Sequence, residues 1–351
     1  MDERRDPGSC GCPPQMGHNE ADAVRSVRPK GKKSIGIFYE LFRLIRLTGG
    51  IMVKKEFILF IVICLFMFLI ATEISYGQEK LKVYISVDIE GIAGVVNGDQ
   101  TSSSGNDYGI ARKWMTQEVN AAIRGALRAG ATEIVVNDSH GSMRNIIISE
   151  LNPEAYLITG SPKPLSMMQG IDDTYDAIFL IGYHARAGSK DGVLDHTYSS
   201  MSVFSIKVNG MELGEAEQNA LIAGCYDVPI VLVTGDQIVC GQVKKSLGEE
   251  VETAVVKEGI GRHAAKSLTP KAAQALIEEK AKIALENRKR IKPLKFQPPY
   301  RFELTYLRSY MADAGELIPQ VKRTGPRTVM FETNDYIEGY KLFCALIGLA
   351  R

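Results

Sequence analysis

Short apolar runs alternate with stretches of helical periodicity from about residue 82 to the end of the chain. The runs are continuously apolar, as is typical of strands covered on both faces of a parallel sheet. The alternation predicts an α/β fold, a three-layer sandwich around a mainly parallel or mixed sheet. The expected strands are residues 83–87, 133–137, 177–181 and 229–234, and the expected helices are residues 108–129, 215–226 and 269–287.

A smaller C-terminal α/β portion is expected from about residue 260. Thr269-Pro270 predicts the start of a helix, with the threonine hydroxyl at the N-cap and the proline at the first helical position. Because no repeat or low-complexity linker interrupts the body, residues 80–351 are expected to form one catalytic unit. Further expected elements are a hairpin of residues 201–208 and 211–213 turning at Asn209-Gly210, strands 303–307 and 328–331, and a final helix from Tyr336.

The first 51 residues do not have the pattern of a folded domain. They are polar, rich in Pro and Gly, and without a hydrophobic period, so residues 1–51 are interpreted as a disordered or mis-called extension. Cys10-Gly-Cys12 with His18 lacks the second cysteine pair that a zinc knuckle needs.

Residues 52–77 have the layout of a secretory signal peptide. Lys54-Lys55 precede an uncharged apolar run, residues 57–71, and small residues two apart follow at Ser75 and Gly77. The run is shorter than the roughly 20 residues of a membrane-spanning helix. The protein is therefore expected to be exported to the periplasm or outside the cell. An uncleaved anchor remains the alternative, and this segment is the only membrane contact expected.

Composition narrows the function classes. The chain has 351 residues, 24% of them charged, and a formal net charge of +1, so charge gives no argument for nucleic-acid binding. The cysteines of the body, Cys225, Cys240 and Cys344, show no CxxC spacing. We expect free buried thiols, with a Cys225–Cys240 bridge as the alternative in an exported protein.

Two carboxylates close the first strand of the body, in the sequence Val87-Asp88-Ile89-Glu90-Gly91. Residues two apart in a strand share a face, so Asp88 and Glu90 are expected to project together. Paired buried acids are costly unless a cation lies between them. An ordinary solvated strand end is the alternative for this stretch taken alone.

Further ligand-type residues follow other strands. His140 and His184 each follow an apolar run, His196 follows a glycine-containing loop, and Glu215 opens a helix. Residues just past different strands of an open α/β sheet converge at its carboxyl edge. Imidazole with carboxylate suits Zn, Mn or Fe(II). Singly, each histidine has an ordinary surface role as its alternative, Glu215 could be a helix-dipole acid, and Asp138 is expected to orient His140.

The combined motifs resemble one known family. They are Val87-Asp88-Ile89-Glu90-Gly91, Val136-Asn137-Asp138-Ser139-His140-Gly141, Gly182-Tyr183-His184-Ala185-Arg186-Ala187 and Gly214-Glu215. In this order, and over residues 82–350, the chain resembles the zinc-dependent D-aminopeptidases of peptidase family M55.

The resemblance implies a site and an activity. It implies two zinc ions per subunit, held by Asp88, Glu90, His140, His184 and Glu215, with Asp88 bridging them. It also implies that His196 is catalytic, that the substrates are short peptides with an N-terminal D-residue, such as D-Ala-D-Ala, and that the subunits form a ring-like homo-oligomer. A water activated by the metals would be the nucleophile, and His196 is our candidate for proton transfer or for stabilising the tetrahedral oxyanion. Direct attack by His196 is a further alternative that the sequence leaves open.

Two other functions are compatible with the same residues. A two-metal phosphoesterase could use Asp-x-Glu with histidines, but the chain has no glycine-rich phosphate loop and only Arg186 near the expected ligands. An exported, non-catalytic metal- or peptide-binding protein is the second alternative. The absence of cysteine from the set argues against a closed structural zinc site.

Overall fold

The computed structural model describes residues 57, 59–65, 67 and 80–350. The chain divides into two units, Met1–Tyr76 and Gly77–Arg351. The extension of residues 1–51 and most of the expected signal peptide lie outside the described residues, so both stay predictions. None of the helices described is long and apolar enough to cross a membrane.

The larger sheet of the second unit has seven strands in the order β3-β2-β1-β4-β7-β8-β9. All neighbours pair in parallel except β8 and β9, which pair antiparallel. The sheet is therefore mainly parallel, as predicted. Its strands are β1 (Lys82–Val87), β2 (Glu133–Asp138), β3 (Ala155–Ile158), β4 (Ala177–Tyr183), β7 (Ile230–Asp236), β8 (Glu252–Gly261) and β9 (Ala264–Ser267).

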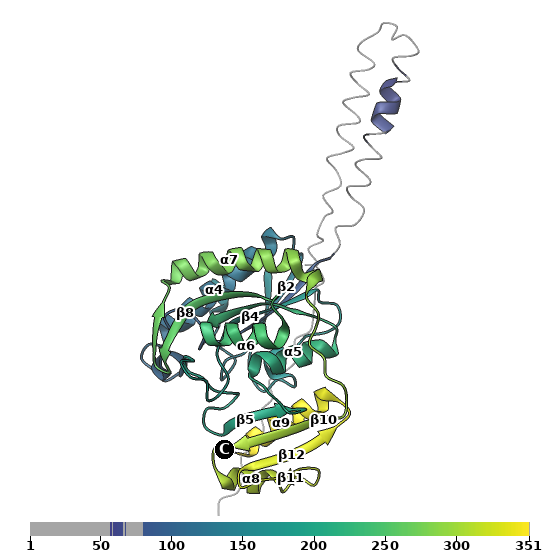
Figure 1. Cartoon of the computed structure of the whole chain (residues 1–351). Helices are drawn as coiled ribbons and strands as arrows, with labels where there is room; N and C mark the ends of the chain where they lie inside the picture. Colours follow the sequence, from purple (N-terminus) through teal and green to yellow (C-terminus); the bar gives the residue numbers. More distant parts are fainter. Residues whose placement is uncertain (1–56, 58, 66, 68–79, 351) are drawn as a thin grey trace, which may run out of the picture. The chain divides into compact units, whose positions relative to one another are not determined.

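Helices cover both faces of this sheet, which confirms the three-layer α/β sandwich (Figure 1). α4 (Tyr108–Arg128) and α7 (Pro270–Asn287) pack together on one face. α5 (Glu215–Cys225) and α6 (Gln237–Leu247) lie on the other. Because both faces are covered, every residue of β4 and β7 is buried, in agreement with their continuously apolar sequences. One short helix, α3 (Gly98–Thr101), precedes α4.

A second, antiparallel sheet has five strands in the order β11-β12-β10-β5-β6. The predicted hairpin is β5 (Val203–Val208) with β6 (Met211–Glu212), and Asn209 and Gly210 in its turn both have positive φ, 51° and 84°. The remaining strands are β10 (Tyr300–Tyr306), β11 (Lys322–Arg323) and β12 (Thr328–Thr333). α8 (Ser309–Gly315) and α9 (Tyr336–Leu349) pack on this sheet (Figure 1).

The smaller sheet takes strands from two separate parts of the chain. The hairpin β5–β6 belongs to it, whereas α7 packs on the larger sheet. A boundary near residue 260 therefore follows neither sheet. Thr269 does occupy the N-cap of α7, but its hydroxyl makes no capping hydrogen bond, contrary to the expectation. Residues 80–350 also contain three short 3₁₀ helices, η1 (Ile148–Glu150), η2 (Ser166–Met168) and η3 (Arg288–Arg290).

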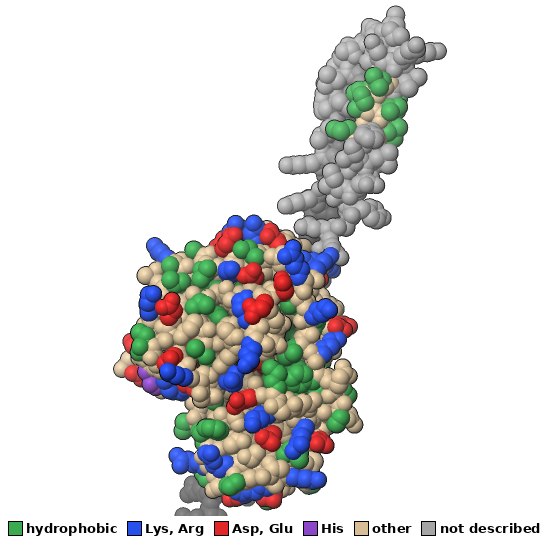
Figure 2. All heavy atoms as spheres, in the orientation of Figure 1, with side chains coloured by type: hydrophobic (Ala, Val, Ile, Leu, Met, Phe, Trp, Pro, Cys, Tyr) green, Lys and Arg blue, Asp and Glu red, His purple; other side chains and the backbone are tan. Residues whose placement is uncertain are grey.

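The cysteine predictions hold in part. Cys225, Cys240 and Cys344 are free thiols, so no bridge joins Cys225 to Cys240. Only Cys240 is fully buried, and Cys225 is exposed, which the sequence interpretation did not expect. On the surface, acidic and basic side chains are interspersed over the face of the second unit that Figure 2 shows.

The strand order places a topological switch point between β1 and β4. From β1 the chain adds β2 and β3 on one side, and it then continues with β4 and β7 on the other. Loops that leave the carboxyl ends of β1 and β4 therefore run in opposite directions and open a crevice between them. This crevice is where the ligand-type residues of the sequence converge.

Candidate active site

Asp88 and Glu90 lie in the loop that leaves β1 at the switch point. The strand ends at Val87, so strand alternation, on which the prediction rested, does not place them. The turn of residues 88–95 brings them together instead. The Asp88 backbone amide donates to the Ile181 carbonyl of the neighbouring strand at 2.8 Å, which anchors the start of this loop. Both carboxylates are buried, with 2% and 5% of their residues exposed.

The three site histidines are each held by a backbone carbonyl. His140 Nε2 lies 2.9 Å from Thr101 O, His184 Nδ1 3.0 Å from Ala185 O, and His196 Nδ1 2.9 Å from Leu194 O. Because a carbonyl oxygen only accepts, the ring nitrogen facing it must carry the hydrogen. This leaves His140 Nδ1, His184 Nε2 and His196 Nε2 free of hydrogen in the neutral rings. All three face carboxylates.

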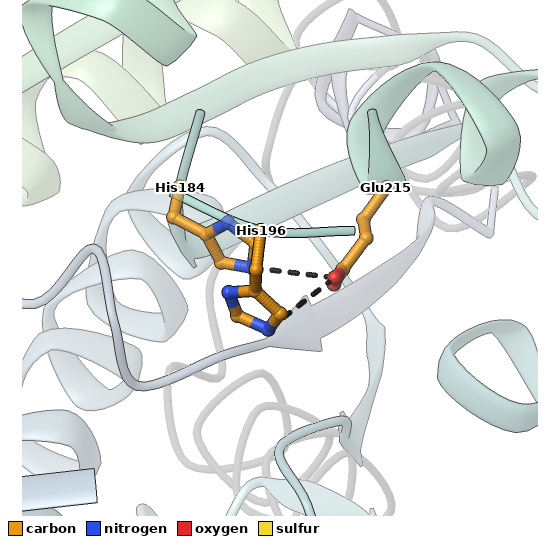
Figure 3. A group of neighbouring side chains, drawn as sticks. All are labelled: His184, His196 and Glu215. Carbon is orange, nitrogen blue, oxygen red and sulfur yellow. Dashed lines mark ion pairs between the residues drawn. The ribbon is translucent and has the colours of Figure 1, made fainter. Parts of the chain in front are cut away.

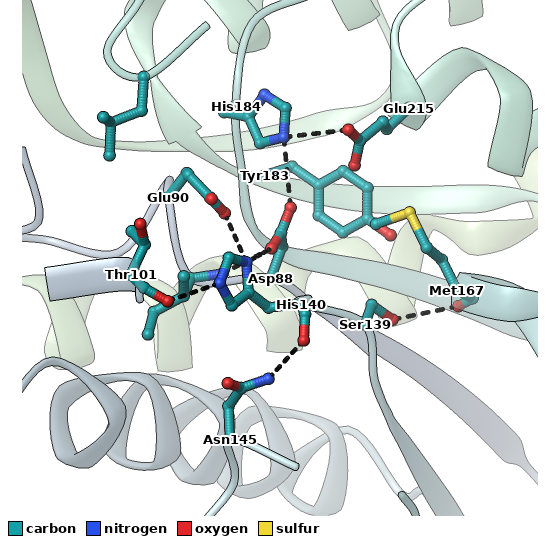
Figure 4. A network of polar contacts seen from close by, with 12 residues as sticks. Asp88, Glu90, Thr101, Ser139, His140, Asn145, Met167, Tyr183, His184 and Glu215 are labelled. Carbon is teal, nitrogen blue, oxygen red and sulfur yellow. Dashed lines mark hydrogen bonds and ion pairs between the residues drawn. The ribbon is translucent and has the colours of Figure 1, made fainter. Parts of the chain in front are cut away.

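Asp88 joins two groups of side chains through its two oxygens (Figure 4). Its Oδ1 lies 3.1 Å from His140 Nδ1, and its Oδ2 lies 3.4 Å from His184 Nε2. Glu90 Oε2 belongs to the first group, 3.0 Å from His140 Nδ1. Glu215 Oε1 belongs to the second, 3.3 Å from His184 Nε2.

Glu215 is the first residue of α5, and its carboxylate is buried, with 4% of the residue exposed. The Tyr198 amide donates to Glu215 Oε1 at 2.6 Å. These contacts distinguish it from a solvated helix-dipole acid. His196 stacks on His184 with 3.9 Å between ring centroids, and its Nε2 is 3.7 Å from Glu215 Oε1 (Figure 3).

The charges of the site are strongly coupled. Burial opposes ionisation of Asp88, but the neighbouring imidazoles of His140 and His184 outweigh it and hold the pKa of Asp88 well below its usual range. Burial also opposes protonation of His184, yet Glu215 and Asp88 raise the pKa of this imidazole well above its ordinary value. Three buried carboxylates therefore create a strong demand for positive charge at this point.

The residues fit divalent metal ions. Glu90 Oε2 and His184 Nε2 are buried and have no hydrogen-bond partner among the described residues. Such orphaned polar atoms are costly unless another group binds them. Asp88, Glu90 and His184 have ligand atoms within 4.8 Å of one another, as do His184, His196 and Glu215. This set of nitrogen and oxygen donors suits zinc, manganese or ferrous iron.

Asp138 does not orient His140 in the way expected. Its carboxylate accepts hydrogen bonds from the Asn145 amide at 2.5 Å, the Asn145 side chain at 2.7 Å and the Ile146 amide at 2.7 Å. The Asn145 side chain also donates to the His140 carbonyl at 2.7 Å. Asp138 thus stabilises the loop after β2, and the His140 ring is oriented by Thr101.

A cavity of about 540 Å³ opens beside these residues, and Asp88, Glu90, His140, His196 and Glu215 line it. Much of its wall carries hydroxyl groups, which can bond to the amides and carbonyls of a peptide. The serines in the wall are Ser102, Ser103, Ser139, Ser142, Ser161, Ser166, Ser199 and Ser200. The apolar part of the wall includes Met143, Met167, Met201 and Ile347.

Comparison with known proteins identifies the family. The family model for peptidase M55, D-aminopeptidase, matches residues 81–345. The chain belongs to the M55 family of D-aminopeptidases. Within this family it is 38% identical over 276 residues to the D-aminopeptidase of Bacillus subtilis (strain 168), covering 77% of this chain and 98% of that protein.

A solved D-aminopeptidase has the same fold. The Zn-dependent D-aminopeptidase DppA from Bacillus subtilis, described as a self-compartmentalizing protease, superposes with a TM-score of 0.75 at 37% identity. The match covers 77% of this chain and 98% of that one. As a member of the D-aminopeptidase family, this chain is a peptidase.

Several residues around the site were not found from the sequence. Thr101, Ala185 and Leu194 act through backbone carbonyls, which every residue carries, so their side chains give no signal. Lys257 of β8 is buried and donates to the Glu90 carbonyl. Asp236, also buried, ends β7 and accepts from the Val193 amide at 2.7 Å in the loop that leads to His196.

Proposed function

We propose that this protein is an aminopeptidase that uses two zinc ions to remove N-terminal D-residues from short peptides such as D-Ala-D-Ala. The observation that carries the proposal is the Asp88 carboxylate, whose two oxygens face two separate groups of ligand-type atoms. A carboxylate between two metal sites is the arrangement of a binuclear hydrolase.

Each of the two groups supplies both carboxylate and imidazole ligands. Asp88 Oδ1, Glu90 and His140 would hold one zinc ion, and Asp88 Oδ2, His184 and Glu215 would hold the other. The three carboxylates offset three of the four positive charges. The backbone carbonyls of Thr101 and Ala185 support the ligands, because they fix the tautomers that point Nδ1 of His140 and Nε2 of His184 into the site.

Zinc bound there would act as a Lewis acid on the scissile carbonyl and would lower the pKa of a water molecule towards neutrality. His196 would move the proton. Its Nδ1 donates to Leu194 O and its ring lies flat against His184, so Nε2 is held at the cavity wall. From there Nε2 can accept a proton and pass it to the leaving amine.

The test combines metal analysis with stereochemical preference. Purified full-length protein should contain two zinc ions per chain and should release D-Ala from D-Ala-D-Ala faster than L-Ala from L-Ala-L-Ala. Replacing His140 or His184 by Ala should lower the zinc content. Preference for the L-dipeptide, or full zinc occupancy in both variants, would refute the proposal.

The two alternative functions predict different results. A phosphoesterase would hydrolyse p-nitrophenyl phosphate faster than any peptide. A binding protein would hold zinc and remain inert towards both D- and L-peptides. The family match favours neither alternative.

We also propose a ring-like homo-oligomer with the sites facing its interior. The support is the relative with this fold, which is described as self-compartmentalizing. Light scattering coupled to size-exclusion chromatography should give a mass several times that of one chain. A monomeric mass would contradict this.

For localisation we propose export to the periplasm or the extracellular space, directed by residues 52–77, on the basis of their sequence pattern. The exported protein should then begin near residue 78, which intact mass spectrometry can determine. A mature chain that retains residues 57–71 would instead indicate a membrane anchor.

A further inference from the structure

The hairpin of β8 and β9 carries none of the proposed ligands, yet it contacts both of the loops that hold the site together. It forms the end of the larger sheet beyond β7. One of the two loops is residues 88–97, which carries Asp88 and Glu90, and the other is residues 185–196, which ends at His196.

Lys257 of β8 holds the first loop in place through hydrogen bonds to its backbone. Only 2% of the residue is exposed, and its ammonium donates to three backbone carbonyls, those of Glu90, Ile92 at 3.0 Å and Val95 at 2.6 Å. An ammonium has three hydrogens, so this loop can take all of them. A buried charge is tolerated only with such partners, and the loop and the lysine therefore hold each other in place.

Two further hydrogen bonds fix the same loop. Ser267 of β9 accepts from the Gly94 amide at 2.8 Å. Glu118 of α4 accepts from the Ala93 amide at 2.9 Å. The carbonyls of the loop thus bind the hairpin lysine, and its amides bind side chains from β9 and α4. Glu90 is the residue at the start of this braced segment.

Arg262, in the turn of the hairpin, holds the second loop. Its guanidinium donates to both the backbone carbonyl and the side chain of Asp195, and its own carbonyl accepts from the Leu194 amide at 2.9 Å. The Leu194 carbonyl is the group that fixes the His196 ring. Asp195 also accepts from the Gly188 amide at 2.7 Å, which closes the loop on itself.

We propose that the β8–β9 hairpin positions the two halves of the site separately. Lys257 positions Glu90 for metal binding, and Arg262 positions His196 for proton transfer. Both are positioning residues, since neither side chain lines the cavity. The inference rests on the proposed function. It predicts that loss of the Lys257 side chain weakens metal binding, whereas loss of the Arg262 side chain lowers the rate of catalysis.

The experiment compares Lys257→Met with Arg262→Met in the full-length protein. Zinc affinity is measured by competition with a chromophoric chelator, and kcat and KM are measured with D-Ala-D-Ala. Lys257→Met should weaken zinc binding at least ~10-fold, the usual effect of losing a group that supports a ligand. Arg262→Met should keep wild-type zinc affinity but lose about 10- to 100-fold in kcat with little change in KM. Arg262→Lys should recover part of that loss.

Lys266→Met is the matched control. Lys266 lies on the same hairpin, its side chain is 78% exposed, and its ion pair is with Glu258 of β8. This variant should match the wild type in zinc affinity and in rate. A similar loss in Lys266→Met would mean that any change in the hairpin matters, which would overturn the specific roles.

Other results would overturn one part of the proposal or the whole of it. Wild-type zinc affinity in Lys257→Met, or wild-type kcat in Arg262→Met, would overturn the corresponding half of the inference. If Lys257→Met does not fold, Ser267→Ala tests the same loop, and unchanged zinc affinity there would count against it. A wild-type protein without zinc or D-peptidase activity would overturn the proposed function itself. An active wild type with unaffected variants would overturn the hairpin roles alone.

Discussion

At the residue scale, His196 differs from the other two histidines in its partners. His140 and His184 each have two carboxylate oxygens within 3.4 Å, whereas His196 Nε2 has one at 3.7 Å. In side-chain exposure it differs only from His184, since His196 is 16% exposed, His140 15% and His184 1%. A ligand needs close, saturated contacts, and a proton carrier needs access to the reacting groups. These differences favour the catalytic role for His196.

The substitution His196→Ala should separate catalysis from metal binding. We expect kcat for D-Ala-D-Ala to fall at least ~10²-fold, because one acid–base group is lost, while the zinc content stays at the wild-type level. Steady-state kinetics and elemental analysis of the same sample measure both. Unchanged turnover would remove His196 from the mechanism, and loss of zinc would make it a ligand.

Glu118 should make stability depend on pH. Burial raises its pKa to about 7, so in the folded protein it stays protonated at pH values where the unfolded chain has released the proton. Stability from this group therefore falls as pH rises from about 4.5 to 7. Glu118→Gln removes the titration and keeps the oxygen that accepts from Ala93.

We compare the free energy of unfolding of Glu118→Gln with that of the wild type at two pH values. The difference, variant minus wild type, should be about 2 kcal/mol larger at pH 7.5 than at pH 5. Urea denaturation at both pH values, with a chelator present so that zinc release does not contribute, measures the difference. An equal effect of the substitution at the two pH values would contradict the assignment.

The sequence predicts the candidate metal ligands better than the residues that support them. Asp88, Glu90, His140 and His184 stand out because polar, metal-binding side chains follow apolar strands. Lys257 gives no such signal, since a lysine in a strand of mixed charged and apolar residues normally faces solvent. Its burial follows only from the loop that folds over it.

At the scale of elements, the close contact between the ends of β1 and β4 sets the distance between Asp88 and His184. The Gly91 amide donates to the Gly182 carbonyl at 2.8 Å. A Cβ at Gly91 would lie 2.0 Å from the Tyr183 carbonyl oxygen, so only glycine allows this approach.

Gly91→Ala should therefore cost about 1–3 kcal/mol of unfolding free energy and should also weaken zinc binding, because β1 and β4 must move apart. Gly241→Ala is the control. Gly241 lies inside α6 with open space around it, and alanine there should add about 0.5–1 kcal/mol. Urea denaturation compares the two, and a Gly91→Ala protein as stable as the wild type would contradict the packing argument.

The central strands and the long helices could be predicted from the sequence. Burial in the larger sheet gives the strands continuous apolar runs, and packing on it gives the helices regularly spaced apolar residues. Other elements could not be predicted in this way. β8 (Glu252–Gly261) mixes charged, apolar and glycine residues, so its sequence has no clear period. α6 starts directly after β7, with Asp236 as both the last strand residue and the N-cap, so no loop signal marks its start.

At the scale of the whole molecule, metal binding should stabilise the fold. Ligands that bind only the folded state add about 2.7 kcal/mol per site at a free concentration of 100 Kd. Calorimetry with zinc should therefore give a Tm several degrees above that with a chelator. Magnesium, which prefers all-oxygen sites, should shift it less. Equal Tm values with zinc and with chelator would contradict a metal site.

The smaller sheet combines strands from two separate parts of the chain, so it can form only after the later part has been synthesised. β5 lies between β6 and β10, and Val208 pairs with Phe302, which leaves the ribosome much later. The last helix, α9, packs on α5, which starts at Glu215, and its Tyr340 hydroxyl contacts that of Tyr198 at 2.8 Å. A chain that terminates before α9 keeps every proposed site residue but lacks this support. The helix that carries Glu215 and the segment that carries Tyr198 are therefore fully packed only after α9 has been synthesised.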